Sequence, residues 1–137
     1  QDCSHYRFNV LISTFETVLN ESMIGAVDWK LLVVDEAHRI KNRKSKVFLA
    51  LNALRTQHRV LLTGTPIQNN IGELWTLLHF IDPVKFNDFD GFSQKFGIMT
   101  ETSQVAVLDK LLKPYLLRRM KDDVAQKIPP KRETIIE

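Results

Sequence analysis

The sequence contains Leu31-Leu32-Val33-Val34-Asp35-Glu36-Ala37-His38, an aliphatic run that ends abruptly in two acids. Four consecutive aliphatic residues predict a β-strand that is buried on both faces, as in a parallel sheet, where polar and apolar residues need not alternate. Asp35 and Glu36 then lie at the carboxyl end of the strand, where open α/β sheets hold their ligands. Because a buried, unpaired carboxylate is costly, we expect both acids to face water and a cation. The segment therefore predicts a site for a magnesium-bound nucleotide.

The composition is that of a soluble globular domain. Of the 137 residues, 44% are hydrophobic and 26% are charged, and the formal net charge is +3, which suits a polyanionic partner without requiring one. The single cysteine, Cys3, excludes an internal disulfide and favours a reducing compartment. No apolar stretch reaches the roughly 20 residues that span a bilayer, and the first residues do not resemble a signal peptide. We therefore expect a soluble chain that is a piece of a longer protein.

Two further segments have the pattern of strands that end in polar residues. Phe8-Asn9-Val10-Leu11-Ile12 precedes Ser13-Thr14, and Arg59-Val60-Leu61-Leu62 precedes Thr63-Gly64-Thr65-Pro66. Helical patterns lie between the three predicted strands, which implies the right-handed crossovers of a parallel sheet. All three strand ends then meet at one edge, so hydroxyls, carboxylates and a glycine backbone converge on one triphosphate.

The two acids have distinct expected roles in phosphoryl transfer. Asp35 is expected to hold Mg²⁺, directly or through water, because this cation prefers oxygen ligands. Glu36 would orient or deprotonate the attacking water. The position of His38 favours a relay between the nucleotide and the third strand end, and a structural histidine is the alternative. An Asp-Glu pair alone also fits a solvated strand end, so the hypothesis depends on its combination with Thr63-Gly64-Thr65.

A run of basic residues follows the acids. Arg39, Lys41, Arg43, Lys44 and Lys46 leave the same predicted edge of the sheet. Such a run by itself fits a solvated loop. Beside a nucleotide site it also fits contacts to the phosphates of a nucleic acid, which add affinity whatever the base sequence. Both interpretations remain open.

The second half of the sequence has helical periodicity. Asn70 with Glu73 resembles a capping box, and apolar residues then follow at helical spacing until Asp82-Pro83. The aromatic stretch 86–96 predicts short helical or irregular structure. A further helix is expected over residues 103–120, kinked or split by Pro114.

Two motifs make the chain resemble helicase superfamily two, and within it the Swi/Snf-like chromatin-remodelling ATPases. Val33 to Asn42 resembles the family's motif II, of the DEAH box type, and Leu61 to Asn70 resembles its motif III. Phe8 to Glu16 is similar to a segment that touches the DNA backbone in relatives, and Leu116 to Val124 resembles the bridge to the second lobe. Lys113 to Ile136 is most similar to the chromodomain-helicase type.

The resemblance implies an α/β fold. The expected architecture is a partial RecA-like lobe of the P-loop NTPase type, with a parallel sheet flanked by helices and a C-terminal helical protrusion. Residues 1–68 would form the motif II and III portion of the first ATP-binding lobe. Residues 69–120 would form the protrusion, and residues 121–137 the bridge toward a second lobe.

The resemblance also implies a set of site residues. Asp35 would be the Mg²⁺-linked acid and Glu36 the hydrolytic base, while His38 would help to couple the nucleotide state to DNA movement. The residues implied at the nucleotide are Thr63, Gly64, Thr65 and Gln68. The residues implied at DNA are Ser13, Thr14, Arg39, Lys41, Asn42, Arg43 and Lys44.

These roles imply ATP and Mg²⁺ as cofactors. The implied partners are double-stranded DNA, the nucleosome with its histones, and the second ATPase lobe, with no membrane, and the implied location is the nucleus. The expected function is that of a fragment of an ATP-dependent DNA translocase that remodels nucleosomes, so the parent protein would be an ATP hydrolase.

The sequence departs from the family pattern in two large ways. No G-x-x-x-x-G-K-[ST] phosphate loop and no second lobe occur in the 137 residues, so we expect the fragment alone to be inactive. The alternative is a non-catalytic DNA- or partner-binding module from a truncated gene product. An RNA helicase of the Asp-Glu-Ala-His group fits less well, because such proteins usually have Ser-Ala-Thr where this chain has Thr63-Gly64-Thr65. Bacterial Swi/Snf-like polymerase-recycling proteins also fit the pattern.

Overall fold

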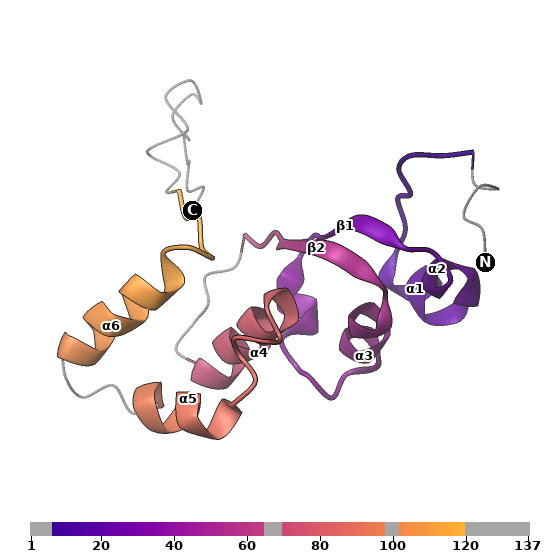
Figure 1. Cartoon of the computed structure of the whole chain (residues 1–137). Helices are drawn as coiled ribbons and strands as arrows, with labels where there is room; N and C mark the ends of the chain where they lie inside the picture. Colours follow the sequence, from indigo (N-terminus) through magenta and orange to yellow (C-terminus); the bar gives the residue numbers. More distant parts are fainter. Residues whose placement is uncertain (1–6, 65–69, 98–101, 120–137) are drawn as a thin grey trace, which may run out of the picture.

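The computed structural model describes residues 7–64, 70–97 and 102–119. Figure 1 shows helices packed around a small sheet. The elements, in chain order, are α1 (Phe15–Asn20), α2 (Ser22–Gly25), β1 (Trp29–Val34), the 3-10 helix η2 (Ala37–Ile40), α3 (Lys46–Ala53), β2 (Thr56–Leu61), α4 (Ile71–Ile81), α5 (Phe89–Phe96) and α6 (Thr102–Leu112). No helix of the described residues is long and apolar enough to cross a membrane.

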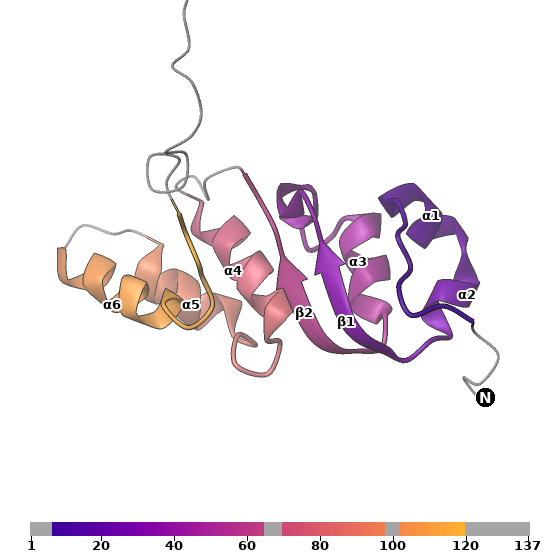
Figure 2. The same ribbon diagram turned by 90° about the horizontal axis from the view of Figure 1, so that it is seen from above.

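The sheet is a parallel pair joined by a helical crossover. β1 pairs with β2 in a register that sets Trp29 opposite Thr56 and Val34 opposite Leu61. Helix α3 makes the crossover, and α3 and α4 both lie below the two strands in Figure 1, displaced to opposite sides of the pair when seen from above in Figure 2. Ser45 accepts a hydrogen bond from the Phe48 amide (3.1 Å) and so begins α3 as a regular N-cap. The predicted α/β fold with a parallel sheet flanked by helices is confirmed.

The prediction of a strand at the first apolar run is wrong. Residues 7–14 form neither helix nor strand, and Val10 and Ile12 are 75% and 92% exposed. A strand exists only through hydrogen bonds to a neighbouring strand, which apolar character does not guarantee. Here the sheet of the described residues has two strands, and Phe8 instead stacks on Trp29 with ring centroids 6.4 Å apart.

The prediction that β1 is buried on both faces is also wrong for this chain. Leu32 and Val34 pack into the core, whereas Leu31 and Val33 are each 51% exposed. In the described residues the helices contribute a core to one face of the strand only. The opposite face is apolar in sequence but open, and Val60, the partner of Val33 in the register, is 41% exposed beside it.

Two hydrophobic clusters share helix α4. The first lies under the sheet and consists of Val34, Ala37, Ile40, Phe48, Leu51, Leu54, Leu77 and Phe80. The second lies among α4, α5 and α6 and consists of Leu74, Trp75, Leu78, Phe86, Phe92, Phe96 and Leu108. Because α4 contributes side chains to both clusters, it fixes the C-terminal helices to the sheet.

Arg59 of β2 forms hydrogen bonds with both α3 and α4. Its guanidinium donates to the side chain and carbonyl of Asn52 on α3 (2.8 and 3.2 Å) and to the Phe80 carbonyl on α4 (2.9 Å). It also lies 4.6 Å from the centroid of the Phe80 ring. Burial lowers the pKa of Arg59, but an arginine remains charged, so these bonds are charge-assisted.

The ends of α4 and α6 differ from the sequence prediction in detail. Asn70 caps α4 by accepting from the amides of Gly72 and Glu73, but the Glu73 carboxylate makes an ion pair with Lys41 (3.0 Å) instead of closing a capping box. Helix α6 ends at Leu112 and does not continue past Pro114. Proline disfavours helical geometry in the residue before it, which explains the early end.

Candidate nucleotide site and basic loop

The carboxyl ends of β1 and β2 are hydrogen-bonded to each other. The Leu62 amide donates to the Val34 carbonyl (2.8 Å), and the Ala37 amide donates to the Leu62 carbonyl (2.9 Å). Asp35 and Glu36 therefore leave β1 at the same edge of the sheet where Thr63 and Gly64 leave β2. Thr65 and Gln68, which sequence places at this edge, lie outside the described residues.

Glu36 has a backbone conformation that favours glycine. Its φ of 51° and ψ of 50° are left-handed, and among the described residues it is the only non-glycine residue with positive φ. Its amide donates to the Asp35 carboxylate (2.8 Å), which closes a tight turn between the strand and η2. Such a conformation costs about 1–3 kcal/mol and is characteristic of functional sites. The turn projects the Asp35 and Glu36 side chains from the end of the sheet.

The carboxylate of Glu36 contacts the imidazole of His38. The distance from Glu36 Oε2 to His38 Nδ1 is 3.1 Å, and the two side chains are 58% and 45% exposed. Both groups are thus accessible to solvent and to a ligand. A carboxylate in contact with an imidazole has fewer accessible orientations, which suits a group that must aim at a water molecule.

The donor set at this edge fits magnesium. Mg²⁺ usually takes one or two protein carboxylates and fills its remaining positions with water and phosphate oxygens. Asp35 is exposed, with one oxygen bonded to the Glu36 amide, and Glu36 lies next to it. The described residues contain no group of three acidic, histidine or cysteine side chains that would make a complete protein cage for a metal. Asp35 and Glu36 could therefore supply one or two of the oxygen ligands of a Mg²⁺ ion.

The beginning of α1 lies beside η2. Thr14 is the N-cap of α1, accepting from the Thr17 amide (3.1 Å), and Ser13 precedes it. Arg39 of η2 pairs with Glu16 at 3.2 Å and lies 4.6 Å from the Phe15 ring centroid. A backbone hydrogen bond and the bond from Arg39 lower the pKa of Glu16. The end of the first apolar run thus approaches the other two strand ends although the run is not a strand.

The basic loop, residues 39–46, contacts side chains of α4 and α5. Lys41 pairs with Glu73 of α4, and the Arg43 guanidinium lies 5.1 Å and 5.6 Å from the ring centroids of Phe89 and Trp75. Sequence reasoning did not identify these contacts, because residues 30 or more positions apart meet there only in the fold. The Asn42 side chain accepts from the Lys44 amide (2.9 Å), which shapes the loop. The Lys44 side chain forms no ion pair with a described residue.

Two parallel strands joined by a helix form a βαβ unit, which is common to many α/β folds. Residues 2–137 match the model of the SNF2-related domain, and the chain belongs to that family. The family resemblance found in the sequence is thereby confirmed.

The relatives and solved structures agree with this assignment. The chain is 50% identical over 132 residues to Protein CHROMATIN REMODELING 4 of Arabidopsis thaliana and 47% identical over 133 residues to Chromodomain-helicase-DNA-binding protein 9 of Mus musculus. Each alignment covers 96% of this chain, but only 6% and 5% of the relative.

Two solved structures from Sulfolobus solfataricus match the fold. The SWI2/SNF2 ATPase core in complex with dsDNA aligns with a TM-score of 0.70 and 33% identity, over 81% of this chain and 24% of that one. The SWI2/SNF2 ATPase core domain aligns with a TM-score of 0.72 and 31% identity, over 94% of this chain and 28% of that one. The chain thus corresponds to about a quarter of an ATPase core.

Proposed function

We propose that this chain is the motif II and III portion of the first ATPase lobe of a DNA translocase that remodels nucleosomes. The main support for this proposal is the pair of hydrogen bonds between the ends of β1 and β2, which hold Asp35-Glu36 next to Thr63-Gly64. One structural relative is described in complex with dsDNA, and one sequence relative is named as a chromatin-remodelling protein. Duplex DNA and the nucleosome with its histones are therefore the proposed partners, and the nucleus is the proposed location.

Each residue at the edge has a proposed task. Asp35 would hold the magnesium ion of ATP, and the ion would supply charge neutralisation for the phosphates. Glu36 would position an attacking water and accept its proton, while His38 orients the Glu36 carboxylate through their 3.1 Å contact. The proposed contacts to the nucleotide, through which its state is coupled to DNA movement, are Thr63, Gly64, Thr65 and Gln68.

The lobe also needs groups that these 137 residues do not contain. The sequence has no glycine-rich loop with a lysine to hold the phosphates. We propose that this loop and a second lobe belong to a longer protein, called the two-lobe protein below, and that the chain alone does not hydrolyse ATP.

ATP turnover tests this function. Hydrolysis is measured for the isolated chain and for the two-lobe protein, each with and without duplex DNA. We expect no turnover by the chain and DNA-stimulated turnover by the two-lobe protein. If DNA does not stimulate the two-lobe protein, the translocase proposal fails. Turnover by the chain above that of its Glu36→Gln variant would show that the fragment is active by itself.

The DNA surface is proposed to include the two residues that precede α1 and the basic loop. Ser13, Thr14, Arg39, Lys41, Asn42, Arg43 and Lys44 are the proposed contacts to the DNA backbone. Of the four basic residues in this set, Arg39, Lys41 and Arg43 also contact other protein side chains, whereas the Lys44 side chain forms no ion pair with a described residue. Replacing those three would remove protein contacts as well as charge, whereas Lys44 offers a cleaner test.

Lys44→Gln in the two-lobe protein is expected to weaken DNA binding equally for all sequences. Loss of one phosphate contact should flatten the slope of log K against log salt by about 0.9. Binding to a duplex is measured by fluorescence anisotropy over a series of salt concentrations. Lys30→Gln is the matched control, because Lys30 is an exposed lysine at the opposite end of β1 that bonds Gln57 (3.3 Å). An unchanged slope for Lys44→Gln would exclude this lysine from the DNA surface.

A further inference from the structure

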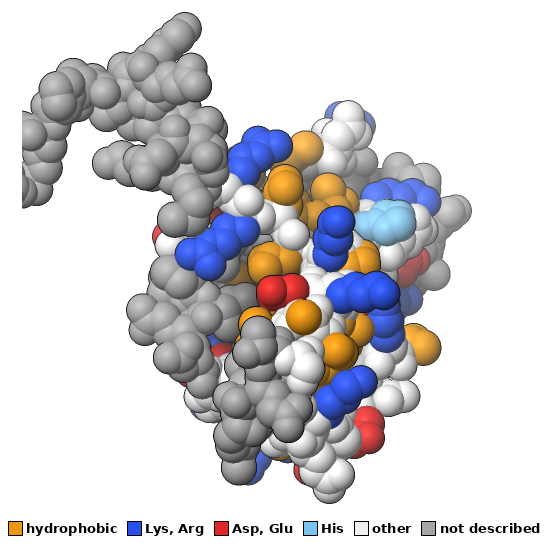
Figure 3. All heavy atoms as spheres, turned by 90° about the vertical axis from the view of Figure 1, so that its left-hand side faces the viewer, with side chains coloured by type: hydrophobic (Ala, Val, Ile, Leu, Met, Phe, Trp, Pro, Cys, Tyr) orange, Lys and Arg blue, Asp and Glu red, His pale blue; other side chains and the backbone are white. Residues whose placement is uncertain are grey.

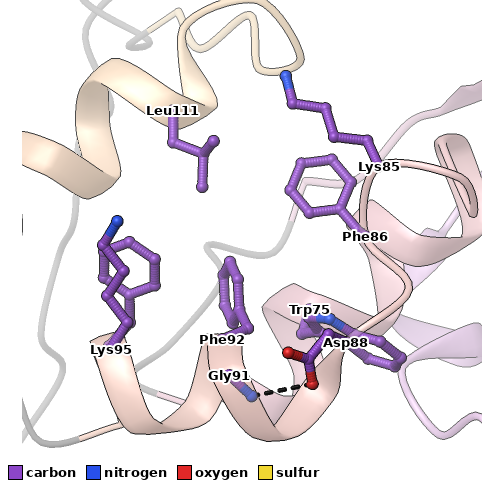
Figure 4. A pocket seen from close by; sticks show the side chains of 9 residues that line it. Trp75, Lys85, Phe86, Asp88, Gly91, Phe92, Lys95 and Leu111 are labelled. Carbon is purple, nitrogen blue, oxygen red and sulfur yellow. Dashed lines mark hydrogen bonds between the residues drawn. The ribbon is translucent and has the colours of Figure 1, made fainter.

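A pocket lies between the C-terminal helices, away from the nucleotide edge. Its volume is about 270 Å³, and its walls come from Trp75 in the middle of α4, the segment that follows α4, α5 and α6. In Figure 4 the side chains of Phe86, Phe92 and Leu111 point into the space. Trp75 and Phe96 complete the apolar part of the wall. Small-molecule sites usually have about 300–1,000 Å³, so this pocket suits one large side chain better than a cofactor.

Two lysines stand at the margin of the pocket. Lys85 Nζ lies 4.7 Å from the centroid of the Tyr115 ring, and Lys95 Nζ lies 5.5 Å from that of Phe96. Neither lysine forms an ion pair with a described residue. The acid in the wall, Asp88, is engaged as the N-cap of α5, where it accepts from the Gly91 amide (3.0 Å). The lining residues thus carry two positive charges and one negative charge, and Figure 3 shows Lys and Arg side chains around apolar ones and an acidic one on this side of the molecule.

The wall also contains a hydrogen-bond donor without an acceptor. Trp75 is 3% exposed, and its Nε1 is buried with no hydrogen-bond partner. Leaving such a donor unpaired costs about 1–3 kcal/mol. Figure 4 shows the nitrogen end of the indole on the side of the pocket. A small opening of the wall would let a ligand with a carbonyl or carboxylate oxygen remove this cost.

We propose that this pocket binds a short acidic segment of a partner protein. One aromatic or large aliphatic side chain of the segment fills the space between Phe86 and Phe92. Its flanking carboxylates contact Lys85 and Lys95, and one of its oxygens accepts from Trp75 Nε1. Duplex DNA fits less well, because its phosphates match the lysines but it offers no apolar side chain for the walls.

Binding of the peptide in the pocket would affect the basic loop. The Trp75 ring that lines the pocket also lies beneath Arg43, at 5.6 Å from guanidinium carbon to ring centroid. A peptide that shifts the indole therefore acts on the segment that follows Asp35 and Glu36. The proposal does not depend on the ATPase function, since the pocket contains none of the proposed nucleotide or DNA residues.

Tryptophan fluorescence of the 137-residue chain tests the proposal. The probe is a synthetic peptide with one phenylalanine flanked on both sides by aspartates. The Trp29→Phe background leaves Trp75 as the single reporter. We expect a saturable change in Trp75 emission, and an affinity at least about tenfold lower in the double variant Lys85→Glu, Lys95→Glu, which is about 1.4 kcal/mol. Circular dichroism verifies that each variant is folded.

Matched controls separate this site from general attraction between charges. Lys110→Glu changes the charge of an exposed lysine on α6 that does not line the pocket, and it should leave the affinity within about twofold. A peptide with serine in place of phenylalanine should bind at least about tenfold more weakly. Absence of saturable binding, equal binding of the serine peptide, or an equal effect of Lys110→Glu would overturn the proposal. Displacement of the peptide by an equimolar duplex oligonucleotide would assign the pocket to DNA and would overturn it too.

Discussion

Glu36→Gln in the two-lobe protein should lower ATP hydrolysis by about 10²–10⁴-fold while ATP still binds. Glutamine has the shape of glutamate but cannot accept a proton at neutral pH. It keeps an oxygen that can face His38, so the turn between β1 and η2 should survive the substitution. Hydrolysis is followed by phosphate release under saturating DNA, and ATP affinity by titration of a fluorescent analogue.

Glu16→Gln provides a matched control for this experiment. Glu16 is also an exposed glutamate that contacts a basic residue of η2, at 3.2 Å from Arg39. We expect its replacement to change turnover by less than about threefold, because loss of an exposed ion pair has a small effect. If Glu36→Gln weakens ATP binding as strongly as hydrolysis, Glu36 is a structural acid and the proposed role is wrong.

Phe80→Ala should destabilise the isolated chain by about 3–5 kcal/mol, the usual cost of removing a buried phenylalanine. Phe80 is fully buried in the cluster under the sheet, and its ring meets Phe48 edge to face at a centroid distance of 5.6 Å. The Arg59 guanidinium also loses the ring beneath it. The free energy of unfolding is measured by urea denaturation followed by circular dichroism.

Val84→Ala is the corresponding control on the surface. Val84 is 83% exposed and follows the end of α4, so its truncation should change the free energy of unfolding by less than about 0.5 kcal/mol. Phe80→Leu should lie between the two, because leucine fills part of the space. A Phe80→Ala variant as stable as Val84→Ala would contradict the packing of α4 against the sheet.

The sequence predicted the strand ends better than it predicted the strands. The acids after Val34 and the Thr-Gly pair after Leu62 are signals that depend on residue type and position alone, and the parallel register brings them to one edge. Asn70 was recognisable as a helix cap for the same reason, since a cap is a local interaction. These parts of the fold could be read without knowledge of the partners of each segment.

The other features of the fold and the site depend on contacts between distant segments, which a sequence pattern does not identify. The apolar residues 8–12 look like a strand, but a strand needs a hydrogen-bonded neighbour, and the described sheet provides none for them. The contacts of Lys41 with Glu73 and of Arg43 with Trp75 and Phe89 join distant segments, so the basic run was interpreted as a solvated loop or a DNA contact only. The proposed catalytic and DNA-binding roles remain predictions that the experiments above address.

The open side of β1 and β2 has a practical consequence for handling the protein. Leu31, Val33 and Val60 present branched aliphatic groups to water on a sheet that has two strands in the described residues. Such a surface favours self-association as concentration rises. Dilute samples, mild detergent or co-expression with a complementary chain segment should therefore improve the yield of monodisperse material.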